Sequence, residues 1–272
     1  MNYRHAFHAG NFADCMKHAL VLWLLSAMQK KPGAVFVLDS HAGIGRYDLS
    51  GPEASRTGEW QRGIARLANP PLELADYVGL VDELGLYPGS PWLLRARLRE
   101  QDRMACCELH PEDHALLRRL FGRDDHVSVH LRDAWEALGG LLPPKTEKRA
   151  LVLIDPPFEA TDEFAQLARG IKLALSRMPN AVIAAWYPIK HRAPPRQFHQ
   201  ALKDSGVRDI VTAELLLRSP LDAARLNGCG LAVVNPPYGF DTAAEGMLTA
   251  LLARLGDGEE GAGIVVERIA GE

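Results

Sequence analysis

The sequence predicts an α/β fold built on a mostly parallel β-sheet. Beyond residue 100, short apolar segments with strand character alternate with amphipathic segments of helical spacing, which is typical of consecutive βαβ units. Continuous apolar character indicates strands that are buried on both faces, as in a parallel sheet. The seven predicted strands are residues 34–38, 104–108, 127–131, 150–154, 181–187, 210–217 and 229–234. The last two are close in the chain and could form an antiparallel pair.

Helices are predicted before the first strand and between the early strands. Asn11 can cap a helix that runs to about residue 31, where a Pro-Gly pair ends it. Ser90 can cap a second helix, with Pro91 at the first helical position, that runs to about residue 101. Three more predicted helices cover residues 111–121, 133–142 and 162–178.

Residues 50–88 interrupt the alternation. They are rich in Gly and Pro and contain two amphipathic stretches, near 59–68 and 72–84. A chain of 272 residues suits one large α/β domain. We therefore expect a single domain over residues 1–272, with a small helical insertion at 50–88.

Composition and charge narrow the possible functions. The net charge is -3 and the pI is near 6.4, so any RNA contact is expected to be local. The four cysteines form no Cys-x-x-Cys pair, which favours buried thiols in a reducing compartment. The N-terminus lacks the apolar core of a signal peptide, and the strongest apolar run, residues 19–25, is too short to span a bilayer. These features predict a cytoplasmic protein without a membrane contact.

A loop with two glycines follows the first predicted strand. Gly43 and Gly45 lie where α/β sheets bind ligands, and glycine there lets a cofactor approach the backbone closely. A dinucleotide fingerprint would need glycine at position 48, which is Asp48, and no Gly-Lys-Ser/Thr sequence of a phosphate loop follows. The loop therefore favours a nucleoside cofactor without phosphates, and S-adenosylmethionine is one.

Acidic residues follow the next two predicted strands. Glu108 can accept hydrogen bonds from the ribose hydroxyls of a nucleoside cofactor, or it can be a solvated charge at the start of a helix. Asp133, which precedes Ala134, can accept the adenine amino group of the cofactor. It can also cap the helix that begins there, and the two roles are compatible.

The tetrapeptide Asp155-Pro156-Pro157-Phe158 follows the strand at 150–154. Two consecutive prolines rigidify the turn and remove two backbone donors, which leaves Asp155 and the Pro156 carbonyl as acceptors. An adenine amine is a poor nucleophile because its lone pair is delocalised, and acceptors on its two N–H bonds would direct that lone pair at a methyl donor. Asp155 can also take up the proton. Phe158 can stack on a flipped-out base.

A second tetrapeptide, Asn235-Pro236-Pro237-Tyr238, also follows a predicted strand. Its composition suits the methylation of an amide or an amine as well. Asp155 follows the fourth strand, next to the glycine loop, where methyltransferase sheets carry the catalytic tetrapeptide. Asn235 follows the seventh strand, far from that point, so the order of the strands favours Asp155 as the catalytic residue.

Short motifs along nearly the whole chain carry a resemblance to a known family. They are residues 3–11 (YRHAFHAGN), 17–18 (KH), 38–47 (LDSHAGIGRY), 56–59 (RTGE), 87–91 (YPGSP), 108–111 (ELHP), 154–159 (IDPPFE), 186–188 (WYP) and 235–237 (NPP). With these motifs the chain resembles the J type of 23S ribosomal RNA adenine-N6 methyltransferases. The resemblance implies a class I S-adenosylmethionine-dependent methyltransferase fold, with a Rossmann-like sheet of seven strands and a small helical insertion. It also implies a monomer that methylates one adenosine of naked or partly assembled 23S rRNA.

The resemblance further implies which residues form the site. The positions that would contact S-adenosylmethionine are His18, His41, Ser90, Glu108, Asp133, Ala134 and Asp155. Asp155 would also be catalytic, and Tyr3 would contact the RNA substrate. Phe158 stands where the family usually has Tyr, so the stacking ring is kept without its hydroxyl and we expect activity to be retained.

Three other interpretations are possible from the sequence: a DNA adenine methyltransferase, a protein glutamine methyltransferase acting through Asn235, and a non-catalytic RNA-binding relative. Residues 50–88 are too few for the recognition domain that DNA enzymes usually carry. A non-catalytic scaffold has no need of the Asp155 turn. No metal is expected, because no standard ligand spacing fits His5, His8, Cys15 and His18. The candidate RNA contacts are Arg4, His5 and the basic residues 190–196, which could also be a solvated loop.

Overall fold

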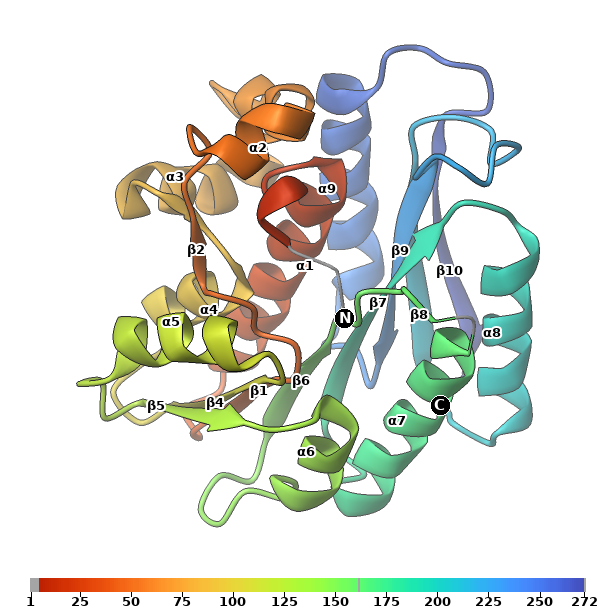
Figure 1. Ribbon diagram of the computed structural model, residues 1–272. Helices are drawn as coiled ribbons and strands as arrows, with labels where there is room; N and C mark the ends of the chain where they lie inside the picture. Colours follow the sequence, from red (N-terminus) through yellow and green to blue (C-terminus); the bar gives the residue numbers. More distant parts are fainter. Residues whose placement is uncertain (1–4, 161, 272) are drawn as a thin grey trace.

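The computed structural model describes residues 5–160 and 162–271, and it contains an eight-stranded sheet (Figure 1). The order of the strands is β10-β8-β9-β7-β6-β1-β4-β5. Their bounds are β1 Phe36–Asp39, β4 Arg103–Glu108, β5 Val127–Leu131, β6 Ala150–Ile154, β7 Val182–Ile189, β8 Ile210–Leu216, β9 Gly228–Val234 and β10 Gly263–Ala270. The five strands from β5 to β7 pair in parallel, which confirms the predicted α/β fold.

The far side of the sheet is antiparallel. β9 pairs with both β7 and β8, so the predicted pairing of the last two strands is confirmed. β10 adds an eighth strand beside β8 that the sequence did not predict. It is an edge strand, partly exposed and carrying Glu267 and Arg268, so it lacks the continuous apolar character of the buried strands.

Helices cover both faces of the sheet. α1 Phe12–Gln29, α4 Ser90–Arg97, α5 Pro111–Phe121 and α9 Phe240–Leu255 pack on one face. α6 Ala134–Gly140, α7 Glu163–Arg177 and α8 Ala193–Asp204 pack on the other. The pleat of β6 serves both layers, because Leu151 and Leu153 belong to the first core and Val152 and Ile154 to the second.

Two helix starts test the capping predictions. Asn11 caps α1 as predicted: its side chain accepts hydrogen bonds from the backbone N–H groups of Ala13 and Asp14. The prediction for Ser90 is wrong. Gly89 is the N-cap of α4, Ser90 is its first helical residue, and the helix ends at Arg97 rather than near residue 101. The Ser90 hydroxyl binds a buried carboxylate instead of the helix end.

Residues 50–88 fold into short helical pieces between the two strands of a small ladder, β2 Arg46–Tyr47 and β3 Tyr87–Pro88. The pieces are α2 Pro52–Thr57, the 3-10 helices Glu59–Arg62, Ile64–Leu67 and Leu72–Leu74, and α3 Ala75–Leu84. The stretch near 59–68 is thus two 3-10 helices rather than one α-helix. Gly63 lies between them. Residue 63 has to be glycine, because a Cβ there would lie 1.9 Å from the Gly10 carbonyl oxygen. α2 lies beyond the N-terminal end of α1, and α3 lies beside that end (Figure 1).

The sheet topology separates the two tetrapeptides. Asp155 follows β6, next to β1 and its glycine loop, at the carboxyl edge of the parallel strands. Asn235 follows β9, which runs antiparallel to β7, so it lies at the opposite edge. There its side-chain amide donates to the carbonyl oxygens of Pro179 and Ala181, at 2.9 and 2.8 Å. Asn235 therefore braces the turn before β7.

The cysteine prediction is confirmed, since all four thiols are free and buried. Among the residues that the structure describes, no helix is long and apolar enough to cross a membrane.

Candidate active site

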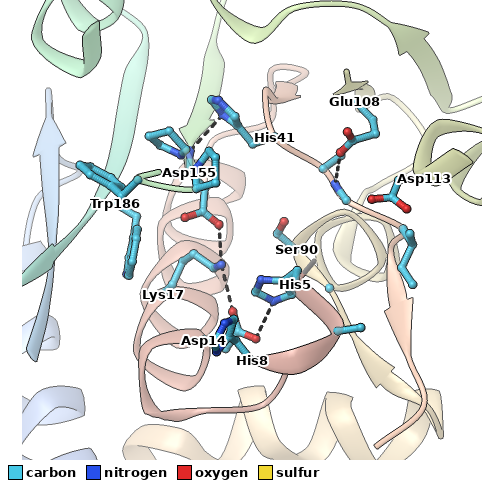
Figure 2. A pocket seen from close by; sticks show the side chains of 18 of the residues that line it. His5, His8, Asp14, Lys17, His41, Ser90, Glu108, Asp113, Asp155 and Trp186 are labelled. Atoms are coloured by element: carbon cyan, nitrogen blue, oxygen red, sulfur yellow. Dashed lines mark hydrogen bonds and ion pairs between the residues drawn. The ribbon is translucent and has the colours of Figure 1, made fainter. Parts of the chain in front are cut away.

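A cavity of about 830 Å³ opens at the carboxyl ends of β1, β4, β5 and β6. Every predicted site residue that the structure describes lines it: His18, His41, Ser90, Glu108, Asp133, Ala134, Asp155 and Phe158. Tyr3 and Arg4 lie outside the described residues. Figure 2 shows how side chains from α1, the β1 loop and the ends of the neighbouring strands converge on this cavity.

The glycine loop is fixed to the neighbouring strand by Glu108. One carboxylate oxygen accepts the backbone N–H of Gly43 at 3.0 Å (Figure 2). The other accepts that of His110 at 2.7 Å. Burial raises the pKa of Glu108, because it penalises the charged form. Gly43 and Gly45 have φ angles of +60° and +82°, in the left-handed region that favours glycine. Gly43 lines the cavity, whereas Gly45 lies against α5, where a Cβ would be 2.6 Å from the Leu120 side chain.

Asp133 is the N-cap of α6, as predicted. Its Oδ1 accepts the backbone N–H groups of Trp135 and Glu136, at 2.9 and 3.1 Å. The cap fixes the carboxylate at the rim of the cavity, beside Ala134. Its contact with an adenine amino group stays a prediction.

His41 joins the glycine loop to the tetrapeptide. Its Nδ1 accepts the backbone N–H of Asp155 at 3.3 Å and lies 2.9 Å from the Ser40 hydroxyl. Burial lowers the pKa of His41 to about 4, so the ring is neutral at physiological pH. A neutral ring can accept at Nδ1, and its Nε2–H is then a donor.

Asp39 is a buried carboxylate that sequence reasoning missed. It ends β1 with no exposed surface, accepts the Ser90 hydroxyl at 2.6 Å and accepts the His41 backbone N–H at 3.3 Å. Burial raises the pKa of Asp39 from 3.8 to about 6. An acidic residue directly after a fully apolar strand was the available signal. The contact explains why Ser90 faces the cavity.

We expect Asp39→Asn to change how stability depends on pH. The folded state holds the Asp39 proton up to about pH 6, whereas the ordinary pKa is 3.8, so between these values the folded state binds more protons. The contribution of Asp39 to stability therefore falls as pH rises through this window, by about 3 kcal/mol in total. Urea denaturation at about pH 4 and about pH 7 should show wild type losing this stability relative to the variant. Parallel pH profiles of the two proteins would contradict the assignment.

Lys17 forms an ion-pair chain under Asp155 that the sequence did not predict (Figure 2). Its Nζ lies 2.5 Å from Asp155 Oδ2 and 3.0 Å from Asp14 Oδ1, and only 6% of its side chain is exposed. Burial opposes the charge on Lys17, but Asp155 and Asp14 outweigh it and hold the pKa of Lys17 well above its ordinary value. The signals in the sequence were the i,i+3 spacing of Asp14 and Lys17 and the place of Lys17 in one of the family motifs.

Asp14 continues the chain to the N-terminal segment. Its Oδ2 accepts the Gly10 backbone N–H at 3.0 Å and lies 2.9 Å from His5 Nε2. Burial alone would raise the pKa of Asp14, but the charges of His5 and Lys17 hold it well below its ordinary value. The segment before α1 is thus fixed to the residues that hold Asp155.

His18, His8 and Cys15, which the sequence offered as a cluster with His5, contact different groups. His18 Nδ1 lies 3.2 Å from the Tyr87 hydroxyl, and burial lowers the pKa of His18 to about 3, so the ring is neutral. His8 Nδ1 lies 2.9 Å from a carboxylate oxygen of Glu59. The Cys15 thiol faces the Gly10 carbonyl oxygen at 3.8 Å. These groups do not converge on one point.

The predicted basic stretch at 190–196 is only partly a loop. α8 begins at Ala193, where two prolines occupy the first turn. Lys190 is exposed and lines the cavity, and an Arg192 guanidinium nitrogen lies 3.6 Å from a carboxylate oxygen of buried Glu214. Lys190 is therefore the residue of this stretch that the structure brings to the site.

The cavity fits a cationic nucleoside without phosphates. Its glycine loop, residues 40–45, carries no Lys or Arg that would meet a phosphate. Glu108 and Asp133 line the same space, and carboxylates favour a positively charged ligand. These residues therefore suit the sulfonium and the ribose of S-adenosylmethionine.

Comparisons with known proteins show the family to which the chain belongs. The family described as "Ribosomal RNA large subunit methyltransferase D, RlmJ" matches residues 32–267. Two relatives called ribosomal RNA large subunit methyltransferase J, from Haemophilus influenzae and Escherichia coli, are each 36% identical over 94% of both chains. A crystal structure of a Legionella pneumophila protein is 33% identical, with a TM-score of 0.87 over 96% of this chain and 98% of that chain. The chain belongs to the RlmJ family of ribosomal RNA methyltransferases, it has the class I methyltransferase fold, and S-adenosylmethionine is its cofactor.

Proposed function

We propose that this methyltransferase transfers the methyl group to the N6 amine of one adenosine in 23S rRNA, with Asp155 as acceptor and base. The observation that carries the proposal is the Asp155-Pro156-Pro157-Phe158 turn at the end of β6. Its carboxylate and its aromatic ring line the same cavity as the glycine loop of β1. An amine acceptor and a stacking ring in one rigid turn suit an exocyclic amine on a flipped-out base.

Asp155 and its neighbours have distinct parts in this proposal. Bound S-adenosylmethionine supplies an electrophilic methyl group on a positively charged sulfur. Lys17 holds Asp155 Oδ2 at 2.5 Å, which leaves Oδ1 to accept one N–H of the adenine amine. The Pro156 carbonyl accepts the other N–H, and the Asp155 carboxylate takes up the proton that the amine loses. Positioning of the amine in line with the methyl group supplies the rest of the rate enhancement.

The cofactor lies on the β1, β4 and β5 side of the cavity in this proposal. Glu108 accepts the ribose hydroxyls, and Asp133 with Ala134 contacts the adenine of the cofactor. His18, His41 and Ser90 line the part between these residues and Asp155. Neutral His18 and His41 suit a cationic ligand, because protonated rings would repel it.

The RNA reaches the cavity from the side of Phe158 and Lys190, and Tyr3 contacts it. We propose a monomer with a single domain over residues 1–272, in which part of the insertion at 50–88 lines the cavity near the start of α1. The proposed substrate is naked or partly assembled RNA. Methylation of a protein glutamine through Asn235 is disfavoured, because that side chain lies at the opposite edge of the sheet. A DNA substrate and a non-catalytic role are outcomes of the test.

Incubation with labelled S-adenosylmethionine and purified rRNA, duplex DNA or protein tests the proposal. We expect label in rRNA alone, and nucleoside analysis should give N6-methyladenosine. Label in DNA, in protein or in a different nucleoside would overturn the assignment of the substrate.

A further inference from the structure

We propose that Trp186 forms a second wall of the slot that holds the target adenine, at an angle to the Phe158 ring, and that it determines the orientation of that base. The inference rests on the proposed function and names a residue of its substrate site. Trp186 lines the same cavity as Asp155 and Phe158, and Figure 2 shows it beside Asp155.

The unequal lengths of two neighbouring strands create the slot. β6 ends at Ile154, which pairs with Ala185 of β7. Beyond this pair the chain turns away through Pro156 and Pro157, while β7 continues to Ile189. Trp186 is therefore the first residue of β7 without a β6 neighbour, at the level of Asp155. Its side chain projects from the α1 face of the sheet and lines the cavity there.

Trp186 and Phe158 form a corner. Their ring centroids are 5.8 Å apart and their planes meet at 72°. Phe158 is itself held by Phe164, at 4.8 Å and 61°. A planar base that lies on one of the two walls meets the other at its edge, so both rings define where the amine points.

The indole is fixed from behind and presents an apolar surface to the slot. Its N–H is buried and has no hydrogen-bonding oxygen or nitrogen among the described residues. The indole N–H lies next to the Cys229 thiol. Burial raises the pKa of this thiol, and the contact with Trp186 lowers it in part. Cys229 Sγ in turn lies 3.6 Å from Met16 Sδ, and Met16 precedes Lys17 on α1. The indole is therefore positioned by the same helix that holds Asp155.

Trp186 and Asp155 recognise different parts of the base. The indole N–H points into the core, so Trp186 can contact the base with its ring but cannot donate a hydrogen bond from its nitrogen. Asp155 accepts the hydrogen bond from the amine. Lys190, exposed at the mouth of the cavity, has the charge to meet the phosphate of the same nucleotide.

Steady-state kinetics with a 23S rRNA fragment test the role of Trp186. We expect Trp186→Leu to lower kcat/KM for RNA by about 5- to 100-fold, the range for loss of one aromatic side chain that contacts a base. The affinity for S-adenosylmethionine should stay within about twofold, because Trp186 lies on the substrate side of the cavity. Trp186→Phe, which keeps an aromatic wall, should recover most of the loss.

Trp23→Leu is the matched control. Trp23 is also partly buried against the α1 core, where it packs on Phe240 of α9 at 5.8 Å. An equal loss in Trp23→Leu would indicate general loosening of the core and overturn the proposal, as would unchanged kcat/KM in Trp186→Leu. A parallel loss of cofactor affinity would also overturn it. The proposed function itself is tested separately with the wild-type protein. It fails if no label enters adenosine of rRNA.

Discussion

Replacement of Asp155 by alanine is expected to lower the rate of methyl transfer by about 10²- to 10⁴-fold, the range for loss of a positioned acceptor and base. The variant loses the carboxylate that would accept the N6–H bond and the proton. Lys17 keeps Asp14 as a partner at 3.0 Å, so the fold should survive. Single-turnover transfer to rRNA and binding of S-adenosylmethionine should be measured together, because the defect should lie in the chemical step.

Asn235→Ala is the control for this variant, since it alters the other tetrapeptide. It removes the two hydrogen bonds to Pro179 and Ala181 and places alanine at a φ of +52°. We expect stability to fall by about 1–3 kcal/mol while the rate is unchanged. A wild-type rate for Asp155→Ala, or a rate loss confined to Asn235→Ala, would contradict the catalytic assignment.

Lys17→Met is expected to have a comparable effect on rate and a larger one on stability. The substitution leaves the carboxylates of Asp14 and Asp155 in the protein interior without their shared cation. Breaking a buried ion pair in this way costs about 3–5 kcal/mol. Because Asp155 loses the contact that orients Oδ2, the rate should fall by about 10²-fold or more. Chemical denaturation and single-turnover kinetics measure the two effects.

The double variant Asp14→Asn with Lys17→Met separates these effects. Removal of the Asp14 charge removes the cost of burying an unpaired carboxylate, so part of the lost stability should return. The rate should not return, because Asp155 still lacks its partner. Full recovery of the rate would mean that Lys17 acts only through the stability of α1.

The sequence predicted those parts of the fold that depend on local pattern. The boundaries of β6 and α5 agree with residues 150–154 and 111–121, because continuous apolar runs and clear amphipathic spacing indicate buried strands and surface helices. β10 and the 3-10 helices did not follow from such patterns. An edge strand needs only one buried face, and Gly63 is required by a neighbour far along the chain, the carbonyl of Gly10.

The order of the strands predicted the candidate site only at the strand ends, whereas His18, His41 and Ser90 followed from the family resemblance. Residues that follow parallel strands meet at one edge, so Glu108, Asp133 and Asp155 could be grouped from their order in the chain. Lys17 lies 138 positions from Asp155, and Asp39 lies 51 positions from Ser90. Such contacts depend on how α1 and α4 pack against the sheet, which no local pattern encodes.

Mass mapping of 23S rRNA from cells that lack this protein tests the central claim most directly. We expect one N6-methyladenosine to be lost, to return when the wild-type protein is supplied, and to stay absent with Asp155→Ala. An unchanged set of N6-methyladenosines in the deficient cells, or restoration of the modification by Asp155→Ala, would contradict the account.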